Sequence, residues 1–125
     1  MTMLLLALAG GLGALSRFVA DAFVARHNPF RMPLGTLLIN VTGSLLLGVL
    51  TAALTAGSPD STGSTLRAVL GTGFCGGYTT FSTASVETVR LWLAEGRSTG
   101  TGYAAATLVG SVAAAAVGLW LGGLT

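Results

Sequence analysis

The chain has 125 residues, of which 52% are hydrophobic and 8% are charged, whereas a soluble domain carries about 25% charged residues. Its mean hydropathy is +0.80, and its formal net charge is only +2. The composition therefore excludes an ordinary soluble domain, and so few charges give no basic surface for nucleic acid. We predict a multi-pass membrane protein surrounded by lipid.

Four stretches of the chain are long and apolar enough to span a membrane as helices, which takes about 20 residues each. They cover residues 3–24, 34–56, 66–92 and 101–124, and the second and fourth contain no charged residue. Short polar loops join them, so no soluble domain fits between them. We predict an all-α membrane protein in which residues 1–125 form one domain of four transmembrane helices. Four helices are too slim to enclose a wide aqueous path, so we expect a partner copy.

The first stretch carries an arginine on the same helical face as two small residues. Gly10, Gly13 and Arg17 lie at i, i+3 and i+7, and Asp21 follows one turn later. A lipid-facing arginine is costly, so this face should contact protein or water. Arg17 is then either paired locally with Asp21 or a positive charge that attracts anions near a pore mouth.

The second and fourth stretches each carry a polar stripe at i, i+4 and i+8. The stripes consist of Thr36, Asn40 and Ser44 and of Tyr103, Thr107 and Ser111. One interpretation is structural, because an intramembrane asparagine often joins helices by hydrogen bonds. The other is functional, because neutral donors bind an anion loosely enough to release it, as conduction requires. Hydroxyls also accept hydrogen bonds, so residue type alone leaves a cation or water path open.

The third stretch contains the most unusual segment, residues 71–83, with the sequence GTGFCGGYTTFST. Its four glycines and the β-branched pair Thr79 and Thr80 are poor helix formers, so we predict a broken helix. Non-helical backbone at membrane depth survives only where protein or a polar cavity surrounds it, and such breaks mark ion or substrate sites. Phe81 follows directly, and the positive edge of its ring can favour an anion.

Together these segments resemble the signature segments of the Fluc (CrcB) fluoride channels: residues 35–44 (GTLLINVTGS), residues 73–83 (GFCGGYTTFST), residues 10–17 (GGLGALSR) and residues 95–97 (EGR). The resemblance implies two such subunits in an antiparallel, dual-topology dimer in the cell inner membrane. Two narrow pores would export fluoride passively and so relieve its cytoplasmic toxicity.

The resemblance also assigns roles to individual residues. It implies a structural sodium ion at the dimer interface, bound by the backbone carbonyls of Gly76 and Thr79. It places Arg17 in a vestibule. The fluoride path that it implies consists of Asn40, Thr80, Phe81, Ser82, Thr83, Tyr103, Thr107 and Ser111.

One position departs from the family pattern. The family usually has a second phenylalanine three residues after the first, whereas this chain has Ala84. The chain therefore forms either a homodimer with incomplete pores or a heterodimer with a paralogue that carries the missing phenylalanine. Arginines gather in the loops on one side of the predicted bundle, which biases the termini to face outward. A fixed orientation of this kind would itself require an oppositely oriented partner.

Three other function classes fit the sequence less well. A small dual-topology, proton-coupled multidrug exporter needs a carboxylate deep in its first helix, where this chain has only Asp21 near the end. A non-conducting partner subunit of a heterodimeric channel would use its glycines for packing alone. An enzyme is not expected, because no constellation of His, Cys and carboxylate side chains is present, and the lone Cys75 is predicted to fill a tight helix contact.

Overall fold

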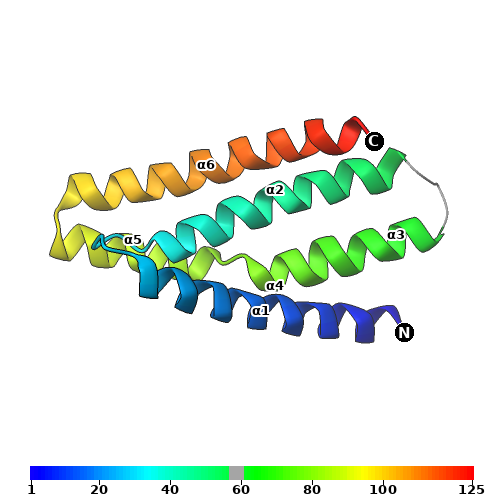
Figure 1. Cartoon of the computed structure of the whole chain (residues 1–125), viewed down its shortest axis with the longest axis horizontal. Coiled ribbons are helices and arrows are strands. Elements are labelled where there is room, and N and C mark those ends of the chain that lie inside the picture. Colours follow the sequence, from blue (N-terminus) through cyan, green and yellow to red (C-terminus); the bar gives the residue numbers. More distant parts are fainter. Residues whose placement is uncertain (57–60) are drawn as a thin grey trace.

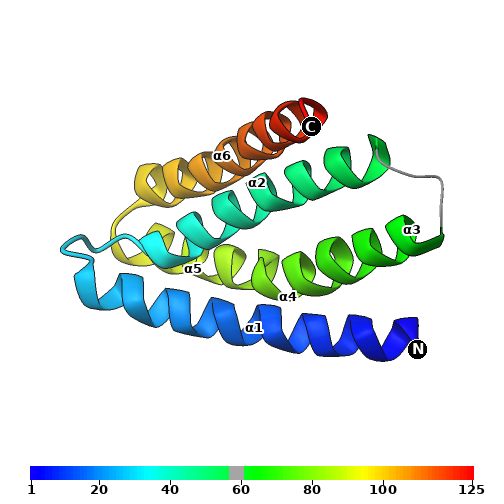
Figure 2. The same ribbon diagram turned by 45° about the vertical axis from the view of Figure 1, so that its right-hand side comes forward.

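The computed structural model describes residues 1–56 and 61–125, and these residues are helical almost throughout (Figure 1). The elements are α1 (Thr2–His27), α2 (Leu34–Ala56), α3 (Ser61–Arg67), the π-helix η1 (Ala68–Cys75), α4 (Gly76–Tyr78), α5 (Phe81–Ala94) and α6 (Arg97–Gly123). Segments α3, η1, α4 and α5 follow one another as a single interrupted column beside α1 and α2 (Figure 2). No strand occurs within the described ranges.

Three helices are long and apolar enough to cross a membrane: Thr2–His27, Leu34–Thr55 and Arg97–Gly123. Many of their leucine, valine and phenylalanine side chains are exposed, notably along α1 and α6. Such an apolar exterior is stable in lipid and not in water. The chain is a multi-pass membrane protein.

Both termini lie at the same end of the bundle, whereas the α1–α2 and α5–α6 connections lie at the opposite end (Figures 1 and 2). The α5–α6 turn is short because Gly96 has a φ of 111°, a conformation that glycine adopts without strain. Arg31 and Glu95 form an exposed ion pair of 3.5 Å between these two connections.

Glycines bring the helix backbones close together at two seams. Between α2 and α6, a Cβ atom added at Gly118 would lie 3.0 Å from the backbone nitrogen of Val49. Between α1 and α4, a Cβ atom added at Gly77 would lie 2.9 Å from the carbonyl carbon of Gly10. Small residues are what membrane helices use for such contacts, since lipid leaves van der Waals packing as a main source of association.

The column formed by α3, η1, α4 and α5 is interrupted over a much shorter stretch than its glycine content predicts. Residues 68–75 form a π-helix and residues 76–78 continue as helix, so only Thr79 and Thr80 are non-helical. The prediction of a break across residues 71–83 was wrong for the glycines. The low helix propensity of glycine is offset here by the close contact that Gly73 and Gly77 make with α1.

Candidate functional site

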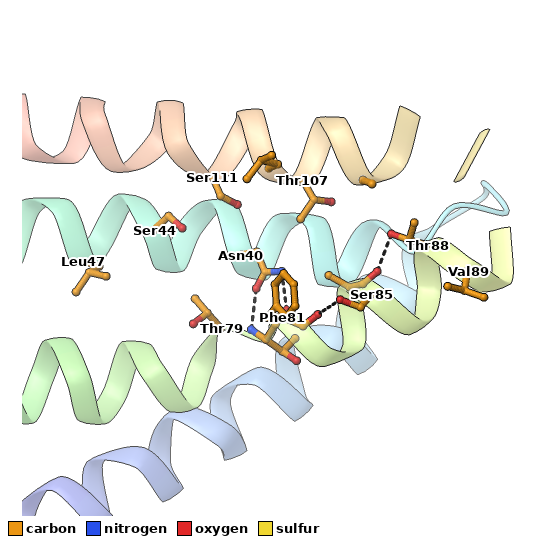
Figure 3. A pocket seen from close by; sticks show the side chains of 14 residues that line it. Asn40, Ser44, Leu47, Thr79, Phe81, Ser85, Thr88, Val89, Thr107 and Ser111 are labelled. Atoms are coloured by element: carbon orange, nitrogen blue, oxygen red, sulfur yellow. Dashed lines mark hydrogen bonds between the residues drawn. The ribbon is translucent and has the colours of Figure 1, made fainter. Parts of the chain in front are cut away.

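The helix is interrupted where Asn40 of α2 reaches the backbone of Thr80. The Asn40 side chain donates from Nδ2 to the Thr80 carbonyl at 2.9 Å, and its Oδ1 accepts from the Thr80 backbone nitrogen at 2.8 Å (Figure 3). Both residues are 8% exposed. Because one amide satisfies both backbone polar groups of Thr80, the extended backbone at this residue is stable at membrane depth.

The interruption leaves two carbonyls without their helical donors. In a continuous α-helix, Thr80 N–H would donate to Gly76 and Thr83 N–H would donate to Thr79. Here the Thr80 nitrogen bonds to Asn40, and the Thr83 nitrogen donates to Thr80 Oγ1 at 3.2 Å. These are the two carbonyls that the resemblance to the Fluc (CrcB) channels implies as sodium ligands.

The Thr79 carbonyl has acquired a different partner. Arg17 of α1 donates to it from Nη1 at 3.2 Å, and Gly76 is exposed. Neutral carbonyl oxygens at an unwound turn suit a sodium ion. The residues therefore fit the predicted ion in chemistry, while a guanidinium already occupies one of the two oxygens.

A groove of about 640 Å³ runs beside the interruption between α2, α5 and α6. In Figure 3, Thr107 and Ser111 reach from α6 toward α2, and Asn40 reaches from α2 toward the interruption. The polar lining consists of Asn40, Ser44, Thr79, Thr80, Ser85, Thr88, Thr107 and Ser111, and the apolar lining of Leu47, Phe81, Ala84, Val89, Ala104 and Leu108. None of the described residues that line it is charged.

The hydroxyl groups in the groove differ in whether their protons are already donated in a hydrogen bond. Thr107 donates to the Tyr103 carbonyl at 2.9 Å, and Ser85 and Thr88 donate to carbonyls of α5 at 2.9 and 2.8 Å. Ser111 Oγ is buried and has no hydrogen-bond partner among the described residues. Ser44, which also lines the groove, makes no side-chain hydrogen bond among the described residues. The hydroxyls of Ser44 and Ser111 and the second amide proton of Asn40 are thus the donors most available to a small ion.

Two residues of α5 differ sharply in burial at the edge of this groove. Phe81 begins the helix and is 88% exposed, whereas Ala84 is 9% exposed. An exposed phenyl ring beside a groove has no packing partner within its own chain. Its ring is therefore free to contact lipid or another protein surface.

A second hollow, of about 310 Å³, lies between α1, α2 and the interruption. Its polar lining consists of Arg17, Asp21, Thr36, Thr80 and Thr83. Thr80 borders both hollows, so the two are separated by the residue that Asn40 holds.

With this geometry in view, comparison with known proteins identifies the family. The family model described as "CrcB-like protein, Camphor Resistance (CrcB)" matches residues 4–119. The chain belongs to the CrcB family. Relatives include the Fluoride-specific ion channel FluC 2 of Cutibacterium acnes, 51% identical over 122 residues that cover 98% of each chain. The Fluoride-specific ion channel FluC 1 of Leifsonia xyli is 51% identical over 131 residues, covering 99% of this chain and 88% of that one. The FluC 1 protein of Streptomyces avermitilis is 47% identical over 124 residues, covering 93% and 92%.

The predicted path and vestibule residues of this CrcB protein line the groove, line the second hollow or lie outside both. Asn40, Phe81, Thr107 and Ser111 line the groove, Thr80 borders both hollows, and Arg17 and Thr83 line the second hollow. Ser82 is exposed and lines neither, although its Oγ lies 3.3 Å from Thr80 Oγ1.

Tyr103 lies apart from both hollows. It is fully buried, and its hydroxyl donates to Glu87 Oε2 at 3.0 Å and to the Pro33 carbonyl at 3.4 Å. Glu87 thus accepts a hydrogen bond from a residue of α6, and among the described residues it forms no ion pair with the nearby Arg90. No local pattern in the sequence signals this contact between two helices.

The sequence also left open a pairing of Arg17 with Asp21. Among the described residues the ion pair found is Arg31 with Glu95, and Arg17 bonds to the Thr79 backbone instead. The CrcB segment GGLGALSR thus directs its arginine to the interruption, a contact between residues 62 positions apart.

Proposed function

We propose that this chain is a subunit of a fluoride-selective channel that exports fluoride passively and relieves its toxicity in the cytoplasm. The observation that carries the proposal is the groove between α2, α5 and α6, whose polar lining is entirely neutral. The names of the CrcB relatives, all fluoride-specific ion channels, support the choice of ion.

The groove chemistry suits a small anion that must both enter and leave. Hydroxyl and amide protons replace part of the hydration shell of the anion, and the absence of a lysine or arginine keeps binding weak. The groove also borders Phe81, the first residue of α5, where the helix dipole is positive. A phenyl edge adds further positive potential without a formal charge.

The channel that we propose is an antiparallel, dual-topology dimer in the cell inner membrane. A single chain offers an open groove and an uncovered Phe81, so each path requires a surface from a second subunit. A structural sodium ion at the interface would be held by the carbonyls of Gly76 and Thr79, which the interruption frees from helical hydrogen bonds. The ion would stabilise the interface and would not be transported.

Ala84 bears on the identity of the second subunit. It lies in the groove lining and is 9% exposed, so a phenyl ring at this position would enter the groove. We propose that a paralogue with phenylalanine at this position completes the path in a heterodimer. If so, this chain alone gives weak fluoride flux and Ala84→Phe increases it, whereas robust flux from the unaltered chain would remove the need for a partner.

The proton-coupled multidrug exporter gains no support from the groove, because that mechanism requires an intramembrane carboxylate and none lines it. A purely non-conducting partner subunit is the remaining alternative, and it predicts no flux in any homodimeric preparation.

The test is fluoride efflux from liposomes, measured with a fluoride electrode, for the wild type, Asn40→Asp and Phe81→Ile, each alone and combined with any paralogous partner. We expect both substitutions to reduce fluoride flux by at least about tenfold, because each removes a feature of the groove wall. Unaltered flux in both variants would contradict the proposed path.

A further inference from the structure

The contact between Arg17 and the Thr79 carbonyl joins a fixed positive charge to an oxygen of the proposed sodium site. The carbonyl has lost its helical donor, since the Thr83 nitrogen donates to Thr80 Oγ1. Arg17 Nη1 takes its place at 3.2 Å. One backbone oxygen is thus the ligand for a guanidinium and, under the proposed function, for a sodium ion.

Packing of α1 on η1 and α4 fixes the backbone from which Arg17 reaches this oxygen. Gly13 lies one turn before Arg17, and a Cβ atom there would lie 2.9 Å from the Tyr78 nitrogen and 3.1 Å from the Phe74 carbonyl carbon. The backbones are therefore in direct contact one turn from the arginine. A helix held this closely fixes where the arginine side chain begins.

The charge on Arg17 is only partly offset by its surroundings. Arg17 forms no ion pair in the described part of the chain, although Asp21 lines the same hollow. Thr36, Thr80 and Thr83 are the other polar residues there, and all are neutral. The field at the Thr79 oxygen is therefore dominated by the guanidinium that bonds to it.

We propose that Arg17 is a positioning residue that opposes sodium: it occupies the Thr79 carbonyl and lowers the affinity of that site for the ion. This inference rests on the sodium site of the proposed function. While sodium is absent, Arg17 satisfies the carbonyl and keeps the interruption intact. When sodium binds, it shares the oxygen with a like charge, so the ion stays exchangeable and responds to the sodium concentration outside the protein.

The test is a sodium titration of the full-length protein, with sodium replaced by an organic cation, and with dimer fraction and thermal midpoint as readouts. Arg17→Gln retains a hydrogen-bond donor and removes the charge, so the sodium concentration at half effect should fall by at least about tenfold. The control is Arg90→Gln. Arg90 is an exposed arginine of α5, so this variant makes the same charge change elsewhere, and the sodium concentration at half effect should shift by less than about twofold.

A second variant, whose expected shift is in the opposite direction, keeps the inference testable if Arg17→Gln does not fold. Asp21 is exposed, so Asp21→Asn should fold, and removal of its negative charge should raise the required sodium concentration by about threefold. An unchanged or raised midpoint in Arg17→Gln, or a lowered one in Asp21→Asn, overturns the inference. If sodium has no effect on the wild-type dimer, both the inference and the proposed sodium site are wrong. Fluoride efflux by the wild type tests the channel proposal independently.

Discussion

Replacing Asn40 by leucine removes the side chain that holds the interruption open. The wild-type amide makes two hydrogen bonds with Thr80, at 2.8 and 2.9 Å. Leucine has the same number of side-chain heavy atoms and the same branching but no polar atoms, so the change removes these bonds while it keeps the outline of the side chain. Thr80 is 8% exposed, and water therefore cannot replace the lost partner.

The magnitude follows from the two bonds. Interhelical hydrogen bonds in membranes contribute about 0.6–2 kcal/mol each, so their loss costs about 1–4 kcal/mol. A buried N–H and C=O left without partners push the value toward the upper half of this range. We expect Asn40→Leu to lower the free energy of unfolding by about 2–4 kcal/mol. Asn40→Asp should cost at least as much, because an ionised carboxylate at this buried position still accepts from the Thr80 nitrogen but lies against the Thr80 carbonyl oxygen with no proton to donate to it.

The assay is unfolding of the detergent-solubilised protein, followed by tryptophan fluorescence. The matched control is Thr51→Val on the same helix, because the Thr51 hydroxyl donates only within α2, to the Leu47 carbonyl at 2.7 Å. The control should cost less than about 0.5 kcal/mol. Our account of the interruption is refuted if Asn40→Leu is no more destabilising than Thr51→Val.

Two further predictions concern the helix seam and the groove. Gly118→Ala should destabilise the protein by about 1–3 kcal/mol, because the added methyl would meet the backbone of α2. Gly102→Ala on the same helix meets nothing within 4 Å and should be neutral or stabilising by up to about 1 kcal/mol; equal effects in thermal unfolding would count against a tight seam. Ser111→Ala should leave thermal stability unchanged or slightly raised, because the buried hydroxyl has no partner among the described residues. The same variant should reduce fluoride efflux, and undiminished efflux would remove Ser111 from the path.

The apolar helices were the part of the fold that the sequence predicts best. Long uncharged stretches identify α2 and α6, and α2 covers residues 34–56, the range expected from hydropathy. The course of the column formed by α3, η1, α4 and α5 was harder to predict, because it depends on contacts between distant residues. Its first helix begins at Ser61, before the predicted residue 66, and its glycines remain helical against α1.

In the candidate site, too, the residue types could be predicted from the sequence, whereas the contacts between distant residues could not. Residue types on three helices predicted a neutral polar surface, and the structure brings Asn40, Thr107 and Ser111 to one groove. What local sequence could not reveal is the pairing of Asn40 with Thr80 across 40 positions, or of Arg17 with Thr79 across 62. Both are contacts to backbone atoms, which every residue offers equally, so no residue type marks them in advance.

The central claim is that the groove conducts fluoride in preference to other halides, and the most direct measurement is paired efflux of fluoride and chloride from the same liposomes. The protein is reconstituted alone and, where one exists, together with a paralogous partner. Our account predicts fluoride efflux well above protein-free liposomes and chloride efflux indistinguishable from them. Equal efflux of both ions, or no fluoride efflux from any dimer containing this chain, would contradict it.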